Sequence, residues 1–151
     1  MPATFQLTDD EIRVAIAMRE IRRGGGMQRV RDRIYGEVVD LGQHDALDVL
    51  VTNGACRMRQ LADALRVDAS TATRTVERLE AAGWAERQPD PGDRRIVVVA
   101  PTEAGLARHE QLRVRAHEAL GELFGRFTPD ELRQLADLLD RLVIGLDDFS
   151  A

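Results

Sequence analysis

The sequence has no lysine, a single cysteine and no long apolar run. All 21 basic residues are arginine, a bias that genome composition explains as readily as function does. Cys56 has no second cysteine with which to form an internal disulfide, which fits a reducing compartment. No apolar stretch approaches the roughly 20 residues that cross a bilayer, and the first residues lack the basic and apolar segments of a secretory signal. We therefore expect a cytoplasmic protein that does not span a membrane.

Length and composition favour one globular domain. The chain of 151 residues is 44% hydrophobic and 31% charged, and it contains no fixed-period repeat or low-complexity linker. Its formal net charge of -5 is unevenly spread, with 7 Arg against 9 Asp and Glu in residues 1–56, 8 against 7 in residues 57–95, and 6 against 10 in residues 96–151. The middle of the chain is the least acidic part, and it leaves room for a basic binding face.

Helical spacing of apolar residues begins near Asp9. Thr8 is placed to cap this helix, because Glu11 follows three residues later as in a capping box. The triple glycine at residues 24–26 costs about 1 kcal/mol per glycine relative to alanine inside a helix, so we expect a break or bend there. We predict two helical pieces joined by a hinge. The second piece has its apolar positions at Met27, Val30, Ile34 and Val38.

Three shorter helices are predicted in the middle of the chain. Residues 43–51 and 58–65 each place apolar side chains on one side, and the first of them ends at Asn53-Gly54. Asp68 is a suitable cap for the third helix, which stops before Gly83. Its buried line is Ala72, Val76 and Leu79, and its outward residues include Ser70, Thr71, Thr73, Arg74, Glu77 and Arg78.

A hairpin and two longer helices complete the chain. Residues 84–87 and 96–100 are short, and the second is β-branched, so we predict two strands joined by turn residues at 89–92. Helices are predicted over residues 102–125 and again after Thr128, which precedes a proline at the first helical position. The last helix carries more leucines than one flank of a small domain readily buries. They are Leu132, Leu135, Leu138, Leu139, Leu142 and Leu146.

Two short helices joined by a tight turn at residues 66–68 and followed by a hairpin describe a helix-turn-helix with a wing. The second helix begins with small hydroxyl residues that approach base edges closely, and its N-terminal amides favour a phosphate. Arg74 and Arg78 lie beyond them, where guanidinium bonds guanine or phosphate. On spacing alone, a solvated face shared with Glu77 fits these arginines equally well. The hydroxyl residues are Ser70, Thr71 and Thr73.

Two adjacent arginines, Arg94 and Arg95, occupy the tip of the predicted hairpin. A narrow minor groove attracts arginine, and a hairpin tip has the width to deliver one. The alternative is an exposed hairpin whose charges serve solubility. Because a helix-turn-helix precedes the hairpin, we favour the minor-groove interpretation.

Four motifs occur in order with sensible gaps. They are Leu61-Ala62, Ser70 to Arg74 with Leu79 and Gly83, Asp93 to Arg95, and Pro101-Thr102 with Gly105. Together they resemble the MarR family of winged-helix transcriptional regulators, most strongly over residues 57–105. The resemblance implies a mainly α fold with a small β-hairpin wing (α+β), in which a winged helix-turn-helix is flanked by N- and C-terminal dimerisation helices. Pro101 replaces the family's usual leucine and removes a backbone donor, and the triple glycine is unusual in a first helix.

The resemblance also assigns regions and residues. It implies a single domain over residues 1–151, with an N-terminal dimerisation region at 9–38, the winged helix-turn-helix at 43–100 and C-terminal dimerisation helices at 102–151. Arg95 falls where the family inserts a wing arginine into the minor groove, and Asp93 where an acid braces the wing. The major-groove surface receives Ser70, Thr71, Thr73 and Arg74.

By the same resemblance, the protein is a homodimer that binds a pseudo-palindromic operator in double-stranded DNA, usually as a repressor. The half-sites then lie roughly 34 Å apart. A small effector, an aromatic acid or a phenol in the family, releases the DNA, but no residue of this sequence is assigned to it. The alternative is a protein-interaction module that keeps the fold without operator binding, which the net charge of -5 encourages.

Neither the histidines nor the cysteine form a catalytic or metal-binding pattern. His44, His109 and His117 are too scattered to ligate one ion, and no nucleophile lies beside a base. We therefore expect no metal, no cofactor and no enzymatic activity. Cys56 lies outside the first helix, where redox-sensing family members carry their thiol, so we expect a packed thiol. Trp84 is expected to anchor the hairpin to the core.

Overall fold

The computed structural model describes residues 7–36 and 40–149, and it confirms a mainly α fold with a hairpin wing. Most helices begin where the sequence supplies a capping side chain, because a side-chain oxygen there accepts a main-chain N–H that has no partner inside the helix. Thr8, Asp40, Asp68, Thr102 and Thr128 do this. The elements are α1 (Asp9–Arg23), α2 (Gly25–Tyr35), α3 (Leu41–Asn53), α4 (Met58–Leu65), α5 (Ala69–Ala81), β1 (Ala85–Pro89), β2 (Val97–Pro101), α6 (Glu103–Phe124) and α7 (Pro129–Asp148).

The predicted hinge is a break at a single glycine. Gly24 is extended, with φ -68° and ψ 142°, and its N–H donates to the carbonyl of Glu20 at 2.7 Å. A Cβ at this position would lie 2.6 Å from that carbonyl oxygen, so the close approach requires glycine although the φ value does not. Gly25 and Gly26 belong to α2. In the predicted second stripe Ile34 is buried, whereas Val38 lies outside the described residues.

The winged-helix unit, residues 41–101, contains the main hydrophobic core. Its three helices pack against one another, and α3 also contacts β2. The predicted apolar faces point inward, because each helix alone exposes a stripe that only its neighbours cover. The fully buried side chains include Leu47, Leu50, Leu61, Val76, Leu79 and Val99.

Both strands of the wing begin and end one or two residues later than predicted. They pair antiparallel, from Ala85 opposite Pro101 to Pro89 opposite Val97. Trp84 immediately precedes β1. Its N–H donates to the carbonyl of Leu79 at 2.9 Å, and its carbonyl accepts from the N–H of Thr102 at 3.0 Å, which continues the pairing of the two strands by one residue. The predicted hairpin is thus confirmed with shifted strand boundaries.

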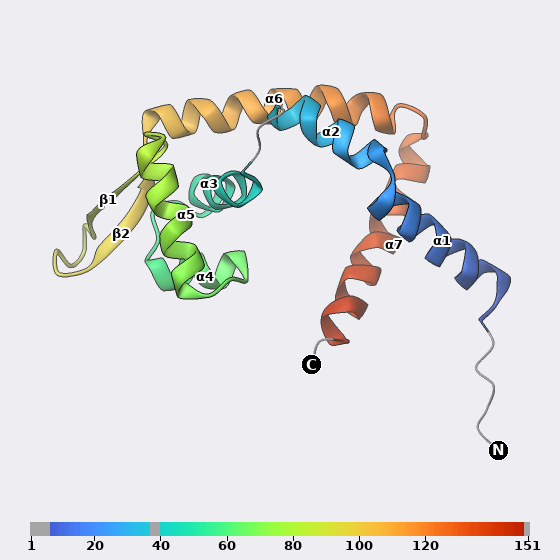
Figure 1. The fold of residues 1–151 in the computed structure, drawn as a ribbon, viewed down its shortest axis with the longest axis horizontal. Coiled ribbons are helices and arrows are strands. Elements are labelled where there is room, and N and C mark those ends of the chain that lie inside the picture. Colours follow the sequence, from blue (N-terminus) through green and yellow to red (C-terminus); the bar gives the residue numbers. More distant parts are fainter. Residues whose placement is uncertain (1–6, 37–39, 150–151) are drawn as a thin grey trace, which may run out of the picture.

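The long helix α6 connects the winged-helix unit to the rest of the chain. Its 22 residues span about 33 Å along the top of Figure 1, with the winged-helix unit below one end and α1 and α7 near the other. We call α1, α2, α6 and α7 the helical arm. Within it α2 packs against α6, but neither α1 nor α7 buries any described residue. Within the described chain, no helix is both long and apolar enough to cross a membrane.

Candidate nucleic-acid interface

The N-terminal end of α5 is organised by its capping residue, Asp68. One carboxylate oxygen accepts the N–H of Thr71 at 2.9 Å and the hydroxyl of Ser70, and the other accepts the hydroxyl of Thr71 at 2.7 Å. These bonds, first that from Ser70, hold the pKa of Asp68 well below its usual range. One of the N-terminal amides that we expected to favour a phosphate, that of Thr71, is therefore already bonded to a carboxylate.

The hydroxyl residues differ in how much surface they present. Ser70 is exposed, whereas Thr71 and Thr73 are half-buried. Thr73 donates its hydroxyl to the carbonyl of Ala69 at 2.8 Å. All three donor hydrogens are thus used inside the protein, and each oxygen keeps lone-pair capacity to accept from an exocyclic amine of a base.

Arg74 and Arg78 have different surroundings. Arg74 is exposed, and its guanidinium has no partner among the described residues. Arg78 forms an ion pair with Asp40, the residue that caps α3. The structure thus leaves Arg74 available for an external ligand and makes Arg78 part of the contact between α5 and α3. The prediction that both read DNA stays a prediction.

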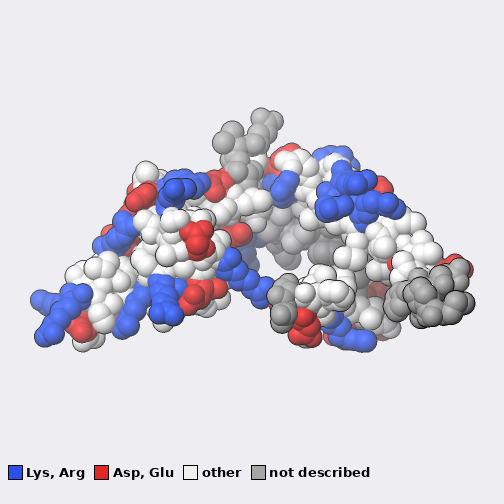
Figure 2. All heavy atoms as spheres, turned by 60° about the horizontal axis from the view of Figure 1, so that its bottom comes forward, with Lys and Arg blue, Asp and Glu red and all other residues white. Residues whose placement is uncertain are grey.

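The tip of the wing is ordered by two carboxylates. Asp90 accepts the N–H of Gly92 at 2.7 Å and that of Asp93 at 3.2 Å, and Asp93 accepts the N–H of Arg95 at 3.0 Å. Asp93 thus bonds to the main chain of Arg95, and the prediction that it braces the wing stays a prediction. The exposed guanidiniums of Arg94 and Arg95 have no ion-pair partner among the described residues. Basic side chains gather at this tip, the left end of Figure 2.

The base of the wing is fixed to α5 and α6. Arg87 of β1 pairs with Glu80 of α5 at 2.5 Å. Thr102 donates its hydroxyl to Gly83 and accepts the N–H of Gly105 at 3.0 Å. At Gly105 an added Cβ would lie 2.0 Å from the carbonyl oxygen of Trp84, so α6 reaches the wing through a glycine. This contact gives the Thr-x-x-Gly motif a structural reason.

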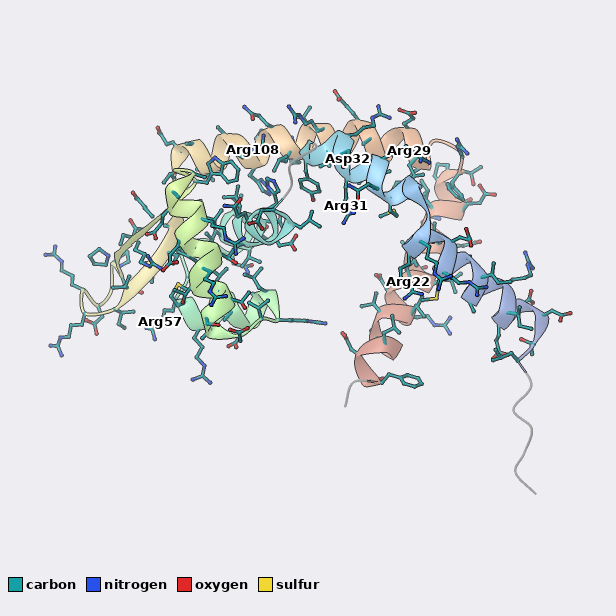
Figure 3. The ribbon with its side chains drawn as sticks, viewed as in Figure 1. Arg22, Arg29, Arg31, Asp32, Arg57 and Arg108 are labelled. Carbon is teal, nitrogen blue, oxygen red and sulfur yellow. The ribbon has the colours of Figure 1, made fainter. Side chains whose placement is uncertain are left out.

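Two further arginines lie on this unit that the sequence did not single out. Arg57, labelled in Figure 3, precedes α4, and Arg59 lies in its first turn. Both are exposed, and neither forms an ion pair within the described residues. The first helix of a helix-turn-helix crosses the DNA backbone, so both positions suit phosphate contacts. Their only sequence signal was the higher share of arginine in residues 57–95.

A second feature that the sequence did not reveal is a cluster where the helical arm meets the winged-helix unit. We call Tyr35, His44, Trp84 and Arg108 the ring cluster. The His44 ring stacks on Tyr35 at 4.8 Å between centroids and on Trp84 at 5.7 Å. The guanidinium carbon of Arg108, which extends from α6 in Figure 3, lies 5.3 Å from the Trp84 ring centre.

The ring cluster contains buried polar atoms without partners. Neither His44 Nδ1 nor Arg108 Nε has a hydrogen-bond partner among the described residues. Burial, and secondly Arg108, lowers the pKa of His44, which is 8% exposed. Buried polar atoms normally bond to something, so these two atoms have unused hydrogen-bonding capacity.

The other candidates of the sequence analysis do not come together. His109 pairs with Asp48 at 2.8 Å, joining α6 to α3, and the described residues contain no group of His, Cys, Asp and Glu that could hold a metal ion. Cys56 is half-buried, exchanges two main-chain hydrogen bonds with Val99, and has its pKa raised by burial. Trp84 packs against the core as expected.

Comparison with known proteins places this geometry among transcriptional regulators. A family model for the MarR family matches residues 39–96. The HTH-type transcriptional regulator PecS of Dickeya dadantii is 30% identical over 120 residues, which cover 77% of this chain and 72% of PecS. A mutant MarR from Escherichia coli, complexed with operator DNA, has a TM-score of 0.69 and 25% identity, covering 91% of this chain and 98% of MarR.

One further structure shares the fold and contains a ligand. The PcaV transcriptional regulator from Streptomyces coelicolor, in complex with its natural ligand, has a TM-score of 0.69 at 22% identity, covering 91% of this chain and 96% of PcaV. Four motifs in order, a wing attached through Gly105 and a relative similar along most of its length all agree. The chain therefore belongs to the MarR family of winged-helix transcriptional regulators.

Proposed function

We propose that the protein is a cytoplasmic homodimeric repressor that binds a pseudo-palindromic operator and releases it when a small effector binds. The observation that carries this proposal is a set of exposed guanidiniums, on α5 and on a wing tip whose main chain is fixed, that pair with no residue in the described part of the chain. A winged helix places these two elements in adjacent grooves. The guanidiniums concerned are those of Arg74, Arg94 and Arg95.

In the proposed complex α5 is the recognition helix, and its residues make different contacts with DNA. Arg74 reaches a guanine or a phosphate in the major groove, where a bidentate contact to guanine contributes about 1–3 kcal/mol of discrimination. Ser70, Thr71 and Thr73 accept hydrogen bonds from base amines, because their own hydrogens are already donated. Arg78 contacts DNA only if it leaves Asp40, and its first role is to hold α5 against α3.

The wing supplies contacts that depend less on sequence. Asp90 and Asp93 fix the tip, so little conformational entropy is lost when Arg94 and Arg95 enter a groove. Arginine in a narrow minor groove responds to the shape and potential of the groove and much less to base identity. Arg57 and Arg59 add phosphate contacts from α4.

Dimerisation is supported by the apolar surface of the helical arm. In α1 the exposed residues include Val14 at 53% and Ile21 at 60%, and in α7 Leu138 at 58% and Ile144 at 62%. Two amphipathic helices without a buried residue expose a larger apolar surface than a monomer ordinarily carries. A second copy that covers α1 and α7 removes this surface from water. The dimer then presents two winged-helix units to two half-sites.

For the effector we propose the ring cluster. It lies where α2 and α6 meet α3 and the wing, so a ligand there changes how the winged-helix unit is attached to the helical arm. Buried Arg108 Nε donates to an anionic oxygen, His44 Nδ1 donates or accepts according to its tautomer, and the stacked rings suit a planar molecule. An aromatic acid or a phenol has this chemistry. The ligand-bound PcaV structure is a precedent on the same fold.

Operator binding is tested with the intergenic DNA upstream of the protein's own gene. Binding is measured at two salt concentrations and compared with unrelated DNA of equal length. We expect selective binding that weakens steeply with salt, as counterions are released from neutralised phosphates. Arg95→Ala should weaken binding across sequences and reduce the salt slope by about 1, whereas Arg74→Ala should also relax base preference. Arg113→Ala, which removes an equally charged residue from α6, is the control. Absence of any DNA preference would favour the protein-interaction module.

The effector site is tested through Trp84, the single tryptophan of the chain. Titration with 4-hydroxybenzoate, salicylate and phenol should change its fluorescence and release operator DNA over the same concentration range. Arg108→Gln should weaken the response to the acids more than the response to phenol, because it removes the charged donor. Arg113→Gln, on the same helix, is the control. Equal responses of Arg108→Gln and the unaltered protein would place the effector elsewhere.

A further inference from the structure

The turn of the helix-turn-helix is joined to the last helix by an ion pair. Arg66 lies between α4 and α5 in the left-handed region, with φ 55°. Its two terminal nitrogens contact the two carboxylate oxygens of Asp147, at 3.0 and 3.3 Å. The pair is bidentate, the arrangement that holds a guanidinium and a carboxylate in one plane.

This pair is one of two ion pairs among the described residues that join the helical arm to the winged-helix unit, and the other, His109 with Asp48, joins α6 to α3. Asp147 is near the end of α7, 81 residues along the chain from Arg66. Arg33 with Glu122 connects two helices inside the arm, and Arg78 with Asp40 connects two helices inside the winged-helix unit. Arg66 with Asp147 connects α7 directly to the turn that precedes the recognition helix.

The backbone around Arg66 connects this ion pair to the start of α5. The Arg66 N–H donates to the main-chain carbonyl of Asp63, and the Val67 N–H donates to that of Ala62, so hydrogen bonds fix the turn to the end of α4. Asp68 follows immediately as the cap of α5. A restraint on the Arg66 side chain therefore acts two residues before Asp68, the cap of α5, through main chain that is itself hydrogen-bonded.

We propose that Arg66 and Asp147 are a positioning pair, which sets the orientation of the winged-helix unit relative to α7 and thereby the separation of the two recognition helices in a dimer. The inference rests on the proposed operator binding for its functional consequence. Both side chains are largely exposed, at 76% and 51%, so the pair is weak and breaks readily. A weak restraint of this kind biases orientation without locking it.

The orientation is measured first without DNA. In a Cys56→Ala chain, spin labels at Glu77→Cys on α5 and Gln134→Cys on α7 report the distance between the two units by pulsed electron resonance. Labelled chains are diluted into unlabelled protein, so that only distances within one chain contribute. We expect a narrow distribution, which Arg66→Asn or Asp147→Asn broadens or shifts. Asparagine tolerates the left-handed backbone at residue 66, so the turn is retained.

Two further variants separate positioning from other roles. The exchange Arg66→Asp with Asp147→Arg should restore the narrow distribution, because it remakes the pair with its charges reversed. Arg113→Asn breaks a bidentate pair with Glu110 inside α6, which is also more than half exposed on both sides, and should leave the distribution unchanged. Identical distributions in the unaltered chain and in both single variants would overturn the proposal, as would failure of the exchange to restore the original distribution.

Operator binding gives the functional readout. On operators whose half-sites are moved apart one base pair at a time, the unaltered protein should prefer one spacing. Arg66→Asn should bind that spacing about two- to fivefold more weakly and discriminate less between spacings. If Arg66 instead acts by touching a phosphate, the exchange variant stays weak at every spacing, which contradicts positioning. Absence of selective DNA binding by the unaltered protein refutes the proposed function, whereas the label distances judge the pair independently.

Discussion

Replacing Gly105 by alanine tests how α6 is attached to the wing. The new Cβ would lie 2.0 Å from the carbonyl oxygen of Trp84 and 2.9 Å from its carbonyl carbon, whereas non-bonded heavy atoms pack best at about 3.5–4.0 Å. Both atoms are main chain and cannot rotate away. Relief requires the start of α6 to move, which breaks the 3.0 Å hydrogen bond from Thr102 to Trp84.

The expected cost follows from these contacts. Overpacking costs about 1–3 kcal/mol and the lost hydrogen bond about 1 kcal/mol, against which alanine gains about 1 kcal/mol of helix propensity. We expect a net loss of about 1–3 kcal/mol in the free energy of unfolding, measured by urea titration with Trp84 fluorescence at fixed protein concentration. Gly121→Ala, in the same helix with no atom within 4 Å, should gain up to about 1 kcal/mol. Equal stability of the two variants would refute the argument.

Three further outcomes follow from the described contacts. Asp68→Ala should destabilise the protein by about 1 kcal/mol through loss of the α5 cap, and an unchanged melting temperature would contradict this. Burial lowers the pKa of His44, so below pH of about 6.5 the unfolded chain takes up a proton that the folded chain resists. The free energy of unfolding should therefore decrease as the pH is lowered, by at most about 1.4 kcal/mol per pH unit. Urea titrations from pH 7.5 to 5.5 should show a shallower slope for His44→Phe, and equal slopes would exclude this role of His44. Gly24→Ala should change the direction of α1 and thereby raise the dimer dissociation constant measured by sedimentation. Gly26→Ala, whose new Cβ meets only a distal atom of Arg29, should leave that constant unchanged. Identical constants for the two variants would show that the break does not require glycine.

Features set by neighbouring residues could be predicted from the sequence. Thr8 with Glu11 and Thr128 with Glu131 form the capping boxes at the starts of α1 and α7, because both partners lie within one turn. The sequence predicted the position of the break at Gly24, but it did not predict why glycine is needed there. The reason for glycine there is the approach of the Glu20 carbonyl, which depends on the angle at which α1 ends.

Features set by distant residues could not be predicted. Trp84 and Arg108 meet because the start of α6 packs against Trp84 at the base of the wing, and no local sequence pattern predicts that contact. Arg78 looked equivalent to Arg74 on helical spacing alone, yet Asp40, 38 residues away, takes it as a partner. Spacing shows which side chains leave a helix on the same side, whereas tertiary contacts decide which of them stay free.

The net charge of -5 is compatible with operator binding because the two signs are used differently in the winged-helix unit. Asp68, Asp90 and Asp93 direct oxygens onto main-chain amides of their own caps and turns, so these carboxylates are held close to the backbone. Arg74 and Arg95 extend outward without partners among the described residues. The acids of α7 lie on another element, where Asp147 is paired with Arg66, and at physiological salt charges beyond about 8 Å are largely screened. The potential that a phosphate meets at the wing is therefore set by the arginines that reach it, and the chain's total charge contributes little there.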